Sequence, residues 1–299
     1  MVTLTRPEGS PAADFTRTRR GLAGLFFAGY ALAAFSAEAE PIHTDAEGLV
    51  TGKVLIPSGG VNLPAFITRP SAPGRYGAVL VVSEIFGIHE YIRDICRRLA
   101  KLGYVAIAPA FFFRAGDPAP LTDFAQIMPI VAKAVHPQIQ GDVGATLAWL
   151  DKQAFVDKGR YAITGFCWGG SVVWMSAAQF PQIKAGAAWY GRLKASKPAP
   201  GAPPAEERPW PIDVVKDLKA PVVGLYGGLD QGITQADVQD MRAALAANHK
   251  ADEIVVYPDA QHGFHADYRP SYNKAAAEDG WARMLALFKS AGVTPGVRA

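Results

Sequence analysis

Short apolar runs alternate with segments in which apolar residues recur every three or four positions, from about residue 50 to near the C-terminus. Residues 52–57 (GKVLIP) and 63–70 (LPAFITRP) are strand-like runs with two glycines between them, which predicts an antiparallel hairpin. Residues 77–84 (GAVLVVSE) form a continuous β-branched run, typical of a strand that is buried on both faces. A helix is expected next, at 92–103, because apolar side chains follow at helical spacing and a glycine ends the segment.

The alternation continues through the rest of the chain. The further expected strands are 104–110, 161–166, 184–191, 220–228 and 252–259, and the further expected helices are 142–153, 171–180, 234–248 (with Thr234 as N-cap) and 273–292. Repeated strand–helix units predict an α/β domain with a mostly parallel central sheet and helices on both faces. Such sheets bind ligands beyond the carboxyl ends of their strands, so polar residues that directly follow strands are the candidate site residues.

Two proline-rich segments interrupt the alternation, at 111–140 and 194–216, and we interpret both as surface loops. A domain boundary at the second segment is the alternative, although the strand pattern resumes directly after it. The expected organisation is a single folded domain at 50–292, preceded by a signal peptide at 1–39 and a linker at 40–49 and followed by a tail at 293–299.

The N-terminal segment has the composition of an export signal. Arg19 and Arg20 precede an uncharged stretch at 21–37, and Ala37-Glu38-Ala39 has the small-x-small pattern of a cleavage site. Paired arginines favour a twin-arginine signal and therefore a bacterial periplasmic or exported protein, without stable membrane association after cleavage. The alternatives are an uncleaved membrane anchor, a misplaced start codon and an appended amphipathic helix. With a non-functional signal the protein would be cytoplasmic.

Composition narrows the possible classes of function. Of the 299 residues, 49% are hydrophobic and 19% are charged, which is enough apolar material for a well-buried core. The net charge of +3 is spread along the chain without a basic stripe, which argues against nucleic-acid binding. Two cysteines cannot form a disulfide framework. We therefore expect a monomer whose partner is a small molecule.

One of the two cysteines, Cys167, lies in GFCWGGS, where a strand is expected to end and a helix to begin. The spacing Gly-x-Cys-x-Gly matches a nucleophile elbow, a sharp turn that lifts the reactive side chain above the sheet. A helix N-terminus favours the thiolate form, and the backbone N–H of Trp168 could face a developing oxyanion. The alternative is a small core residue, which is our interpretation of Cys96 on the apolar face of its helix.

Two polar residues follow other expected strands, in the chain order nucleophile, acid, histidine. Asp230 directly follows one strand, and His262 lies in the loop between the last strand and the last helix. A histidine there can move the thiol proton while a carboxylate orients its ring. Asp259 and His265 are the rival choices, and each residue taken alone fits a turn or surface position. The histidines lack the close spacing of a zinc site, so no metal is expected.

Four stretches, VVSEIFGI, GFCWGGS, YGGLDQGI and PDAQHGFHADYRPSYN, resemble the dienelactone hydrolase (carboxymethylenebutenolidase) family, and the resemblance covers roughly residues 50–290. The resemblance implies an α/β-hydrolase fold, no metal and no cofactor. It also implies a catalytic triad, carried here by Cys167, Asp230 and His262.

The resemblance further implies roles for residues around the triad. Glu84 would contact the resting cysteine and swing aside when substrate binds, and the amides of Ile85 and Trp168 would hold the oxyanion. A salt bridge is the alternative role of Glu84. The family uses arginines to hold a substrate carboxylate, but one of them lies closer to the histidine motif than any arginine here. The substrate-binding candidates in this chain are Arg114, Tyr190 and Arg269.

Together these features predict a hydrolase of ester or lactone bonds that works through an acyl-cysteine intermediate. A general esterase or thioesterase without preference for lactones is one alternative. A catalytically silent binding protein with the hydrolase fold is a second. A redox thiol protein is a third, disfavoured because no other cysteine lies near Cys167 in the sequence.

Overall fold

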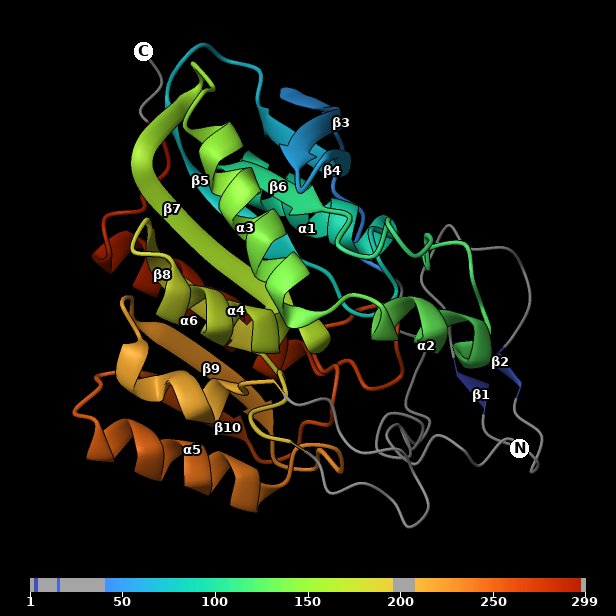
Figure 1. Cartoon of the computed structure of the whole chain (residues 1–299), viewed down its shortest axis with the longest axis vertical. Coiled ribbons are helices and arrows are strands. Elements are labelled where there is room, and N and C mark those ends of the chain that lie inside the picture. Colours follow the sequence, from blue (N-terminus) through green and yellow to red (C-terminus); the bar gives the residue numbers. More distant parts are fainter. Residues whose placement is uncertain (1–2, 5–14, 17–40, 196–207, 297–299) are drawn as a thin grey trace.

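The computed structural model describes residues 3–4, 15–16, 41–195 and 208–296. The expected export signal at 1–39 lies outside the described residues, except for two short paired strands, β1 (Thr3–Leu4) and β2 (Phe15–Thr16). Within the described part of the chain, no helix is both long and apolar enough to cross a bilayer. Figure 1 shows the domain that follows, in which helices surround a central sheet.

An eight-stranded sheet in the order β10-β9-β8-β7-β5-β6-β4-β3 forms the centre of the molecule. Its strands from β10 to β6 run parallel, whereas β4 pairs antiparallel with both β6 and β3. β5, the continuous apolar run, is buried along its whole length, as a strand covered on both faces must be. The strand bounds are β3 Leu49–Ser58, β4 Val61–Pro70, β5 Tyr76–Val82, β6 Val105–Pro109, β7 Val156–Phe166, β8 Ile183–Trp189, β9 Val222–Gly227 and β10 Glu253–Tyr257.

The expected N-terminal hairpin is confirmed by the pairing of β3 with β4, in which Ser58 stands opposite Val61. Gly59 and Gly60 form the two-residue turn with φ of 56° and 79°. A turn with two positive φ angles matches the twist of the flanking strands and favours glycine at both positions.

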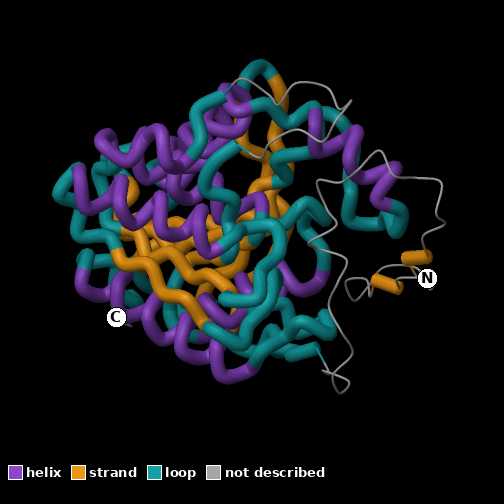
Figure 2. The backbone as a smooth tube through the Cα atoms, turned by 90° about the horizontal axis from the view of Figure 1, so that it is seen from below, coloured by secondary structure: helices purple, strands orange, loops and turns teal. Residues whose placement is uncertain are grey.

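Helices cover both faces of the sheet, as Figures 1 and 2 show. One apolar cluster joins the sheet to α3, α4 and α5, and a second joins its other face to α1 and α6. Thr234 caps α5 as expected, because its side chain accepts a hydrogen bond from the amide of Asp237 at 3.2 Å. The helix bounds are α1 Glu90–Lys101, α2 Phe124–Ala132, α3 His136–Leu150, α4 Trp168–Gln179, α5 Gln235–Ala247 and α6 Lys274–Ser290.

The prediction that 111–140 is a loop is wrong in part, because α2 and the first turn of α3 lie within it. Asp123 caps α2 by accepting the amide of Ala125 at 2.9 Å. Pro137 lies in the first turn of α3, where the missing N–H of a proline leaves no helical hydrogen bond unmade. In the second proline-rich segment, Pro211–Asp217 forms a 3-10 helix, and 196–207 lie outside the described residues.

Residues expected to be linker and tail are packed on the domain. The amide of Thr44 donates to Asp94 in α1 at 2.6 Å, and β3 already begins at Leu49. At the other end Val293 is fully buried, and the amide of Gly296 donates to the carbonyl of Gly103 at 3.0 Å. Apolar burial and backbone hydrogen bonds therefore extend the folded domain beyond 50–292 at both ends.

Candidate active site

Cys167 lies between the end of β7 and the start of α4, in the strand–turn–helix context that the elbow requires. Its backbone has φ 56° and ψ −117°, a conformation that non-glycine residues rarely adopt. Two hydrogen bonds hold this turn: the amide of Cys167 donates to Trp189 at 3.0 Å, and its carbonyl accepts from Gly170 at 3.0 Å. Backbone strain of this kind costs about 1–3 kcal/mol and persists at functional sites.

The glycines that flank Cys167 are required by close backbone approach. A Cβ atom on Gly165 would lie 2.3 Å from the carbonyl oxygen of Gly169. A Cβ atom on Gly169 would lie 2.4 Å from the carbonyl oxygen of Val82 in β5. Side-chain carbons do not tolerate such distances, so the strand and the helix can meet at this angle only if both positions are glycine.

Asp230 follows β9 and reaches the histidine that sequence analysis paired with it. Its Oδ2 lies 2.7 Å from Nδ1 of His262. Its Oδ1 accepts the amides of Gly232 at 2.8 Å and Ile233 at 3.0 Å. Since an ionised carboxylate can only accept hydrogen bonds, Nδ1 of His262 carries a proton and Nε2 is left for the thiol of Cys167.

The electrostatics of His262 reflect both neighbours. Burial lowers its pKa, but the charge and hydrogen bond of Asp230, followed by a hydrogen bond with Cys167, raise the pKa to about 9. Both the acid and the ring are buried, at 5% exposure each. The three residues expected to converge from three different strand ends therefore lie together, with Asp230 hydrogen-bonded to His262 and the pKa of His262 raised further by Cys167.

The rival residues have other environments. Asp259 is exposed on the surface. His265 is buried, its Nδ1 lies 2.7 Å from the hydroxyl of Tyr91, and its ring packs against Trp189 and Trp281. Burial, followed by the charge of Arg98, lowers the pKa of His265 to about 3, so this ring stays neutral.

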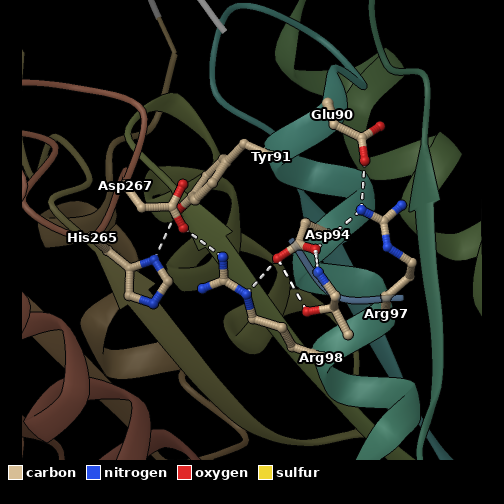
Figure 3. Close-up of polar contacts among 8 residues, drawn as sticks. Glu90, Tyr91, Asp94, Arg97, Arg98, His265 and Asp267 are labelled. Atoms are coloured by element: carbon tan, nitrogen blue, oxygen red, sulfur yellow. Dashed lines mark hydrogen bonds and ion pairs between the residues drawn. The ribbon is translucent and has the colours of Figure 1, made fainter. Parts of the chain in front are cut away.

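A buried ion network anchors the loop that carries His262, as Figure 3 shows. Arg98 of α1 donates to Asp94 at 2.6 Å and to Asp267 at 2.5 Å. The hydroxyl of Tyr91, from the same helix, bonds His265 beside this pair. The second half of the histidine loop is therefore tied to α1.

A cavity of about 250 Å³ opens beside Cys167. Ile85 and Trp168, whose amides were expected to hold the oxyanion, line it together with Cys167. Apolar side chains from α2, α3 and α4 also line it, among them Met128, Ile139 and Met175. Arg192 and Arg208 lie in the same wall. The cavity is suited to an apolar group attached to a reacting carbonyl.

Glu84 is fully buried and takes part in a salt bridge, the alternative considered from the sequence. The hydroxyl of Tyr268 donates to Oε2 at 2.6 Å, and Nη2 of Arg269 lies 3.7 Å from Oε1. Burial raises the pKa of Glu84, but Arg269, His89 and Tyr268 outweigh it and lower the pKa to about 2. The described contacts of the Glu84 carboxylate are with these residues and not with Cys167.

The three substrate-binding candidates differ in their placement. Arg269 lies in the site: its charge interacts with Glu84 and with Cys167, and its guanidinium stacks over Phe86 at 4.9 Å. Tyr190 is fully buried and has a positive φ of 40°. Its ring packs edge-to-face against His262, with the ring centroids 5.0 Å apart, so it positions the histidine.

Arg114 is not brought to the site. It donates to both oxygens of Asp142, at 2.6 and 2.9 Å, and to the carbonyl of Ser58 at 3.0 Å. Asp142 is almost fully buried on α3, so its charge captures the guanidinium and turns it away from the cavity. The expectation that Arg114 binds substrate is corrected by these contacts.

Sequence reasoning missed several residues of the site: Arg192 and Arg208 in the cavity wall, and His89 and Tyr268 beside Glu84. His89, from the start of α1, and Tyr268, from the histidine loop, both contact Glu84. The position of His89, a few residues after the buried strand β5 and close to Glu84 in the sequence, was the available signal. Among the described residues, no group of three or more histidine, cysteine, aspartate or glutamate side chains could hold a metal ion.

Comparison with known proteins identifies the family to which the chain belongs. The family model described as "Dienelactone hydrolase family" matches residues 63–292. The chain belongs to the dienelactone hydrolase family. A curated relative from Methylorubrum extorquens, named "Putative carboxymethylenebutenolidase", is 46% identical over 287 residues, covering 95% of this chain and 97% of the relative. A Bradyrhizobium protein named "Probable 2-oxo-3-(5-oxofuran-2-ylidene)propanoate lactonase" is 30% identical, covering 77% of this chain and 90% of its own length.

A solved structure extends the comparison to the fold. The crystal structure titled "Putative Dienelactone Hydrolase" from Klebsiella pneumoniae superposes with a TM-score of 0.74 at 46% identity, covering 81% of this chain and 98% of that one. The α/β-hydrolase fold expected from the sequence is confirmed, and the chain is a hydrolase of this family.

Proposed function

We propose that the protein hydrolyses ester or lactone bonds with Cys167 as the nucleophile. The observation that carries the proposal is the strained placement of Cys167 at the start of α4, close enough to raise the pKa of a histidine that Asp230 orients. The short bond between Asp230 and His262 fixes the ring, and the raised pKa of His262 favours an imidazolium beside a thiolate.

The chemistry follows from these positions. The thiolate of Cys167 attacks the carbonyl carbon, and a carbon–sulfur bond forms while the carbonyl oxygen becomes an oxyanion. The amides of Ile85 and Trp168, both in the cavity wall, are the donors for that oxyanion. The carbon–oxygen bond to the alcohol then breaks as His262 gives its proton to the leaving oxygen, which leaves a thioester on the enzyme.

Water completes the cycle. His262, now neutral, removes a proton from a water molecule that attacks the thioester carbonyl, and the carbon–sulfur bond breaks to release the acid. For a lactone, the alcohol and the acid are parts of one product. The name of the Bradyrhizobium relative supports lactones as one substrate class.

Arg269 is the group best suited to bind a carboxylate on the substrate. It is a partly buried cation whose charge interacts with Cys167, and its link to Glu84 is long, at 3.7 Å. Burial lowers the pKa of Arg269, but its neighbours Tyr268, Glu84 and Cys167 raise it, so the guanidinium keeps its proton. An incoming carboxylate would compete with Glu84 for this cation.

The direct test is hydrolysis of 4-nitrophenyl acetate by wild type and by Cys167→Ala. We expect turnover in wild type, none above background in the variant, and an acetyl group on Cys167 in mass spectra of briefly reacted wild-type protein. Cys96→Ala is the matched control, since Cys96 is fully buried and burial raises its pKa. A panel of lactones, esters and thioesters then separates lactonase from esterase and thioesterase activity.

Other outcomes would contradict the proposal. Binding of esters or lactones without turnover of any of them would favour a silent binding protein. Reversible disulfide formation on peroxide treatment, with no acylation of Cys167, would favour a redox thiol protein.

We also propose export of the protein through the N-terminal segment, as the paired arginines suggest. Expression of the full chain followed by cell fractionation tests this. Replacing Arg19 and Arg20 together by lysine is expected to keep the enzyme in the cytoplasm, and equal periplasmic yield from that variant would contradict a twin-arginine signal.

A further inference from the structure

His89 is a buried histidine for which the proposed mechanism has no use. It lies at the N-terminus of α1 with 4% exposure, and its ring stacks on Tyr91 at 5.9 Å and meets Tyr268 edge-on at 5.3 Å. Its Nε2 lies 3.5 Å from Oε2 of Glu84, which is too long for a good hydrogen bond. Nδ1 has no hydrogen-bond partner within the described residues. Buried polar atoms are normally paired, so an imidazole held this way calls for an explanation.

The carboxylate beside it is shared between two possible cations. Arg269 lies 3.7 Å from Oε1 of Glu84 and Nε2 of His89 lies 3.5 Å from Oε2, so neither contact is tight. The only short bond to this carboxylate in the described structure comes from the hydroxyl of Tyr268, at 2.6 Å. Tyr268 therefore fixes the position of the Glu84 carboxylate, while either Arg269 or a protonated His89 can neutralise its charge.

We propose that His89 takes up a proton when Arg269 leaves Glu84 to bind a carboxylate on the substrate. This rests on the proposed function of Arg269. In the resting site, Glu84 and Arg269 form a neutral pair and His89 is uncharged. If Arg269 turns to a substrate anion, Glu84 is left as a buried carboxylate without a cation, which is strongly unfavourable in a low-dielectric interior. A proton on His89 restores the balance at a contact that already exists.

The charged groups that face His89 explain why its pKa should rise when Arg269 moves away. Burial lowers its pKa, Glu84 raises it, and the charges of Arg269 and Arg93 lower it. The uncharged neighbours are Tyr91 on its own helix and Tyr268 on the histidine loop. When Arg269 moves away from Glu84, one of the two cations that lower the pKa of His89 is removed. Of these two bases, the Glu84 carboxylate then interacts with His89 alone, which raises the pKa of His89. Binding of an anion at Arg269 and protonation of His89 therefore favour each other, as linkage requires.

A pair of matched esters isolates this effect. Mono-4-nitrophenyl glutarate and 4-nitrophenyl pentanoate have acyl chains of the same length, and the first ends in a carboxylate where the second ends in a methyl group. The ratio of their kcat/KM values cancels the titrations of Cys167 and His262, because both esters need those groups equally. Between about pH 8.5 and pH 6, the ratio for wild type is expected to rise as the pH falls, approaching about tenfold per pH unit for one linked proton.

Two variants locate the proton. His89→Gln keeps a polar side chain that cannot titrate, and its ratio is expected to be independent of pH. Arg269→Met is expected to bring the ratio close to one at every pH. His249→Asn is the control for loss of a histidine as such, because His249 is exposed, and it is expected to retain the wild-type slope.

The possible failures are distinguishable. A pH-independent ratio in wild type, or a slope that persists in His89→Gln because Glu84 itself takes the proton, would overturn the inference about His89 alone. Absence of hydrolysis of both esters by wild type would instead contradict the proposed function.

If His89→Gln does not fold, NMR of carbon-13-labelled histidine in Cys167→Ala replaces the kinetic test. Benzoate, but not the neutral isostere benzamide, is expected to move the titration midpoint of His89 to higher pH. An unchanged midpoint in saturating benzoate would overturn the inference.

Discussion

Replacing Asp230 by asparagine tests how strongly His262 depends on a carboxylate. Burial lowers the pKa of His262, yet Asp230 and Cys167 together raise it to about 9 from an ordinary 6.5, which corresponds to roughly 3 kcal/mol in favour of the protonated ring. Asp230 contributes more to this than Cys167 does. Asparagine keeps an oxygen that can accept the amides of Gly232 and Ile233, so the loop geometry is expected to survive.

The catalytic consequence is a change of tautomer. The NH₂ group of the asparagine would donate to Nδ1 of His262, so Nδ1 must accept this hydrogen bond and the ring carries its proton on Nε2. A protonated Nε2 cannot accept the proton of the Cys167 thiol. We expect kcat/KM for 4-nitrophenyl acetate to fall by about 10²–10⁴. Asp259→Asn is the matched control, because Asp259 lies three residues from His262 but is exposed, and it is expected to behave as wild type.

The same substitution has a pH-dependent effect on stability. A histidine pKa that is higher in the folded than in the unfolded state contributes stability that is complete below about pH 6.5 and is lost as the pH rises through about 9. Asp230→Asn should therefore unfold at a lower temperature than wild type near pH 6, and the difference should narrow towards pH 9.5. A variant with kcat/KM within tenfold of wild type and an unchanged His262 titration by NMR would refute this reasoning.

Four other substitutions test the framework of the site. Gly169→Ala is expected to prevent soluble folding, since its Cβ would lie 2.4 Å from a carbonyl oxygen of β5. Gly141→Ala is the matched control, because the space around Gly141 in its helix is open, and it should raise the free energy of unfolding by about 1 kcal/mol. Soluble expression and melting temperature check both expectations. Arg114→Met is expected to destabilise the fold by about 3–5 kcal/mol by leaving the buried Asp142 uncompensated, with kcat/KM unchanged, and a selective rise in KM would reinstate Arg114 as a substrate ligand. Glu84→Gln should also lower the melting temperature. Because the pKa of Glu84 is about 2 against an ordinary 4.5, the stability that the ionised carboxylate contributes is present above pH 4.5 and is lost as the pH falls towards 2, where the melting temperatures of wild type and variant should converge. A difference in melting temperature that does not shrink on acidification would contradict this role of Glu84.

The fold could be predicted from the sequence because its strands carry their own signal. β5, β9 and residues 161–166 of β7 and 185–189 of β8 are apolar runs separated by helical segments, and their burial on both faces leaves few polar positions to obscure them. The helix α2 was missed since the prolines around it were taken as loop signals. Its cap, Asp123, was visible in the sequence, but an aspartate before an apolar segment is also common in turns.

The triad could be predicted because backbone topology alone brings its members together. Cys167, Asp230 and His262 each follow a strand of one parallel sheet, and the carboxyl ends of those strands lie at one edge. The fate of Arg114 could not be predicted in this way. Its partner Asp142 is on the inner face of a helix, and only the packing of that helix on the sheet decides which cation it meets.

The two carboxylates of the site are held in different ways, and this difference suggests different duties. Asp230 gives one oxygen to two backbone amides and the other to His262, all at hydrogen-bond distance, so it cannot move without breaking three bonds. Glu84 has one short bond, from Tyr268, and faces Arg269 across 3.7 Å. A rigid acid suits a residue that must orient a ring through every step of a reaction. A loosely paired acid suits one whose cation is exchanged for a substrate anion, and the nearby imidazole of His89 makes that exchange possible without stranding a charge in the interior.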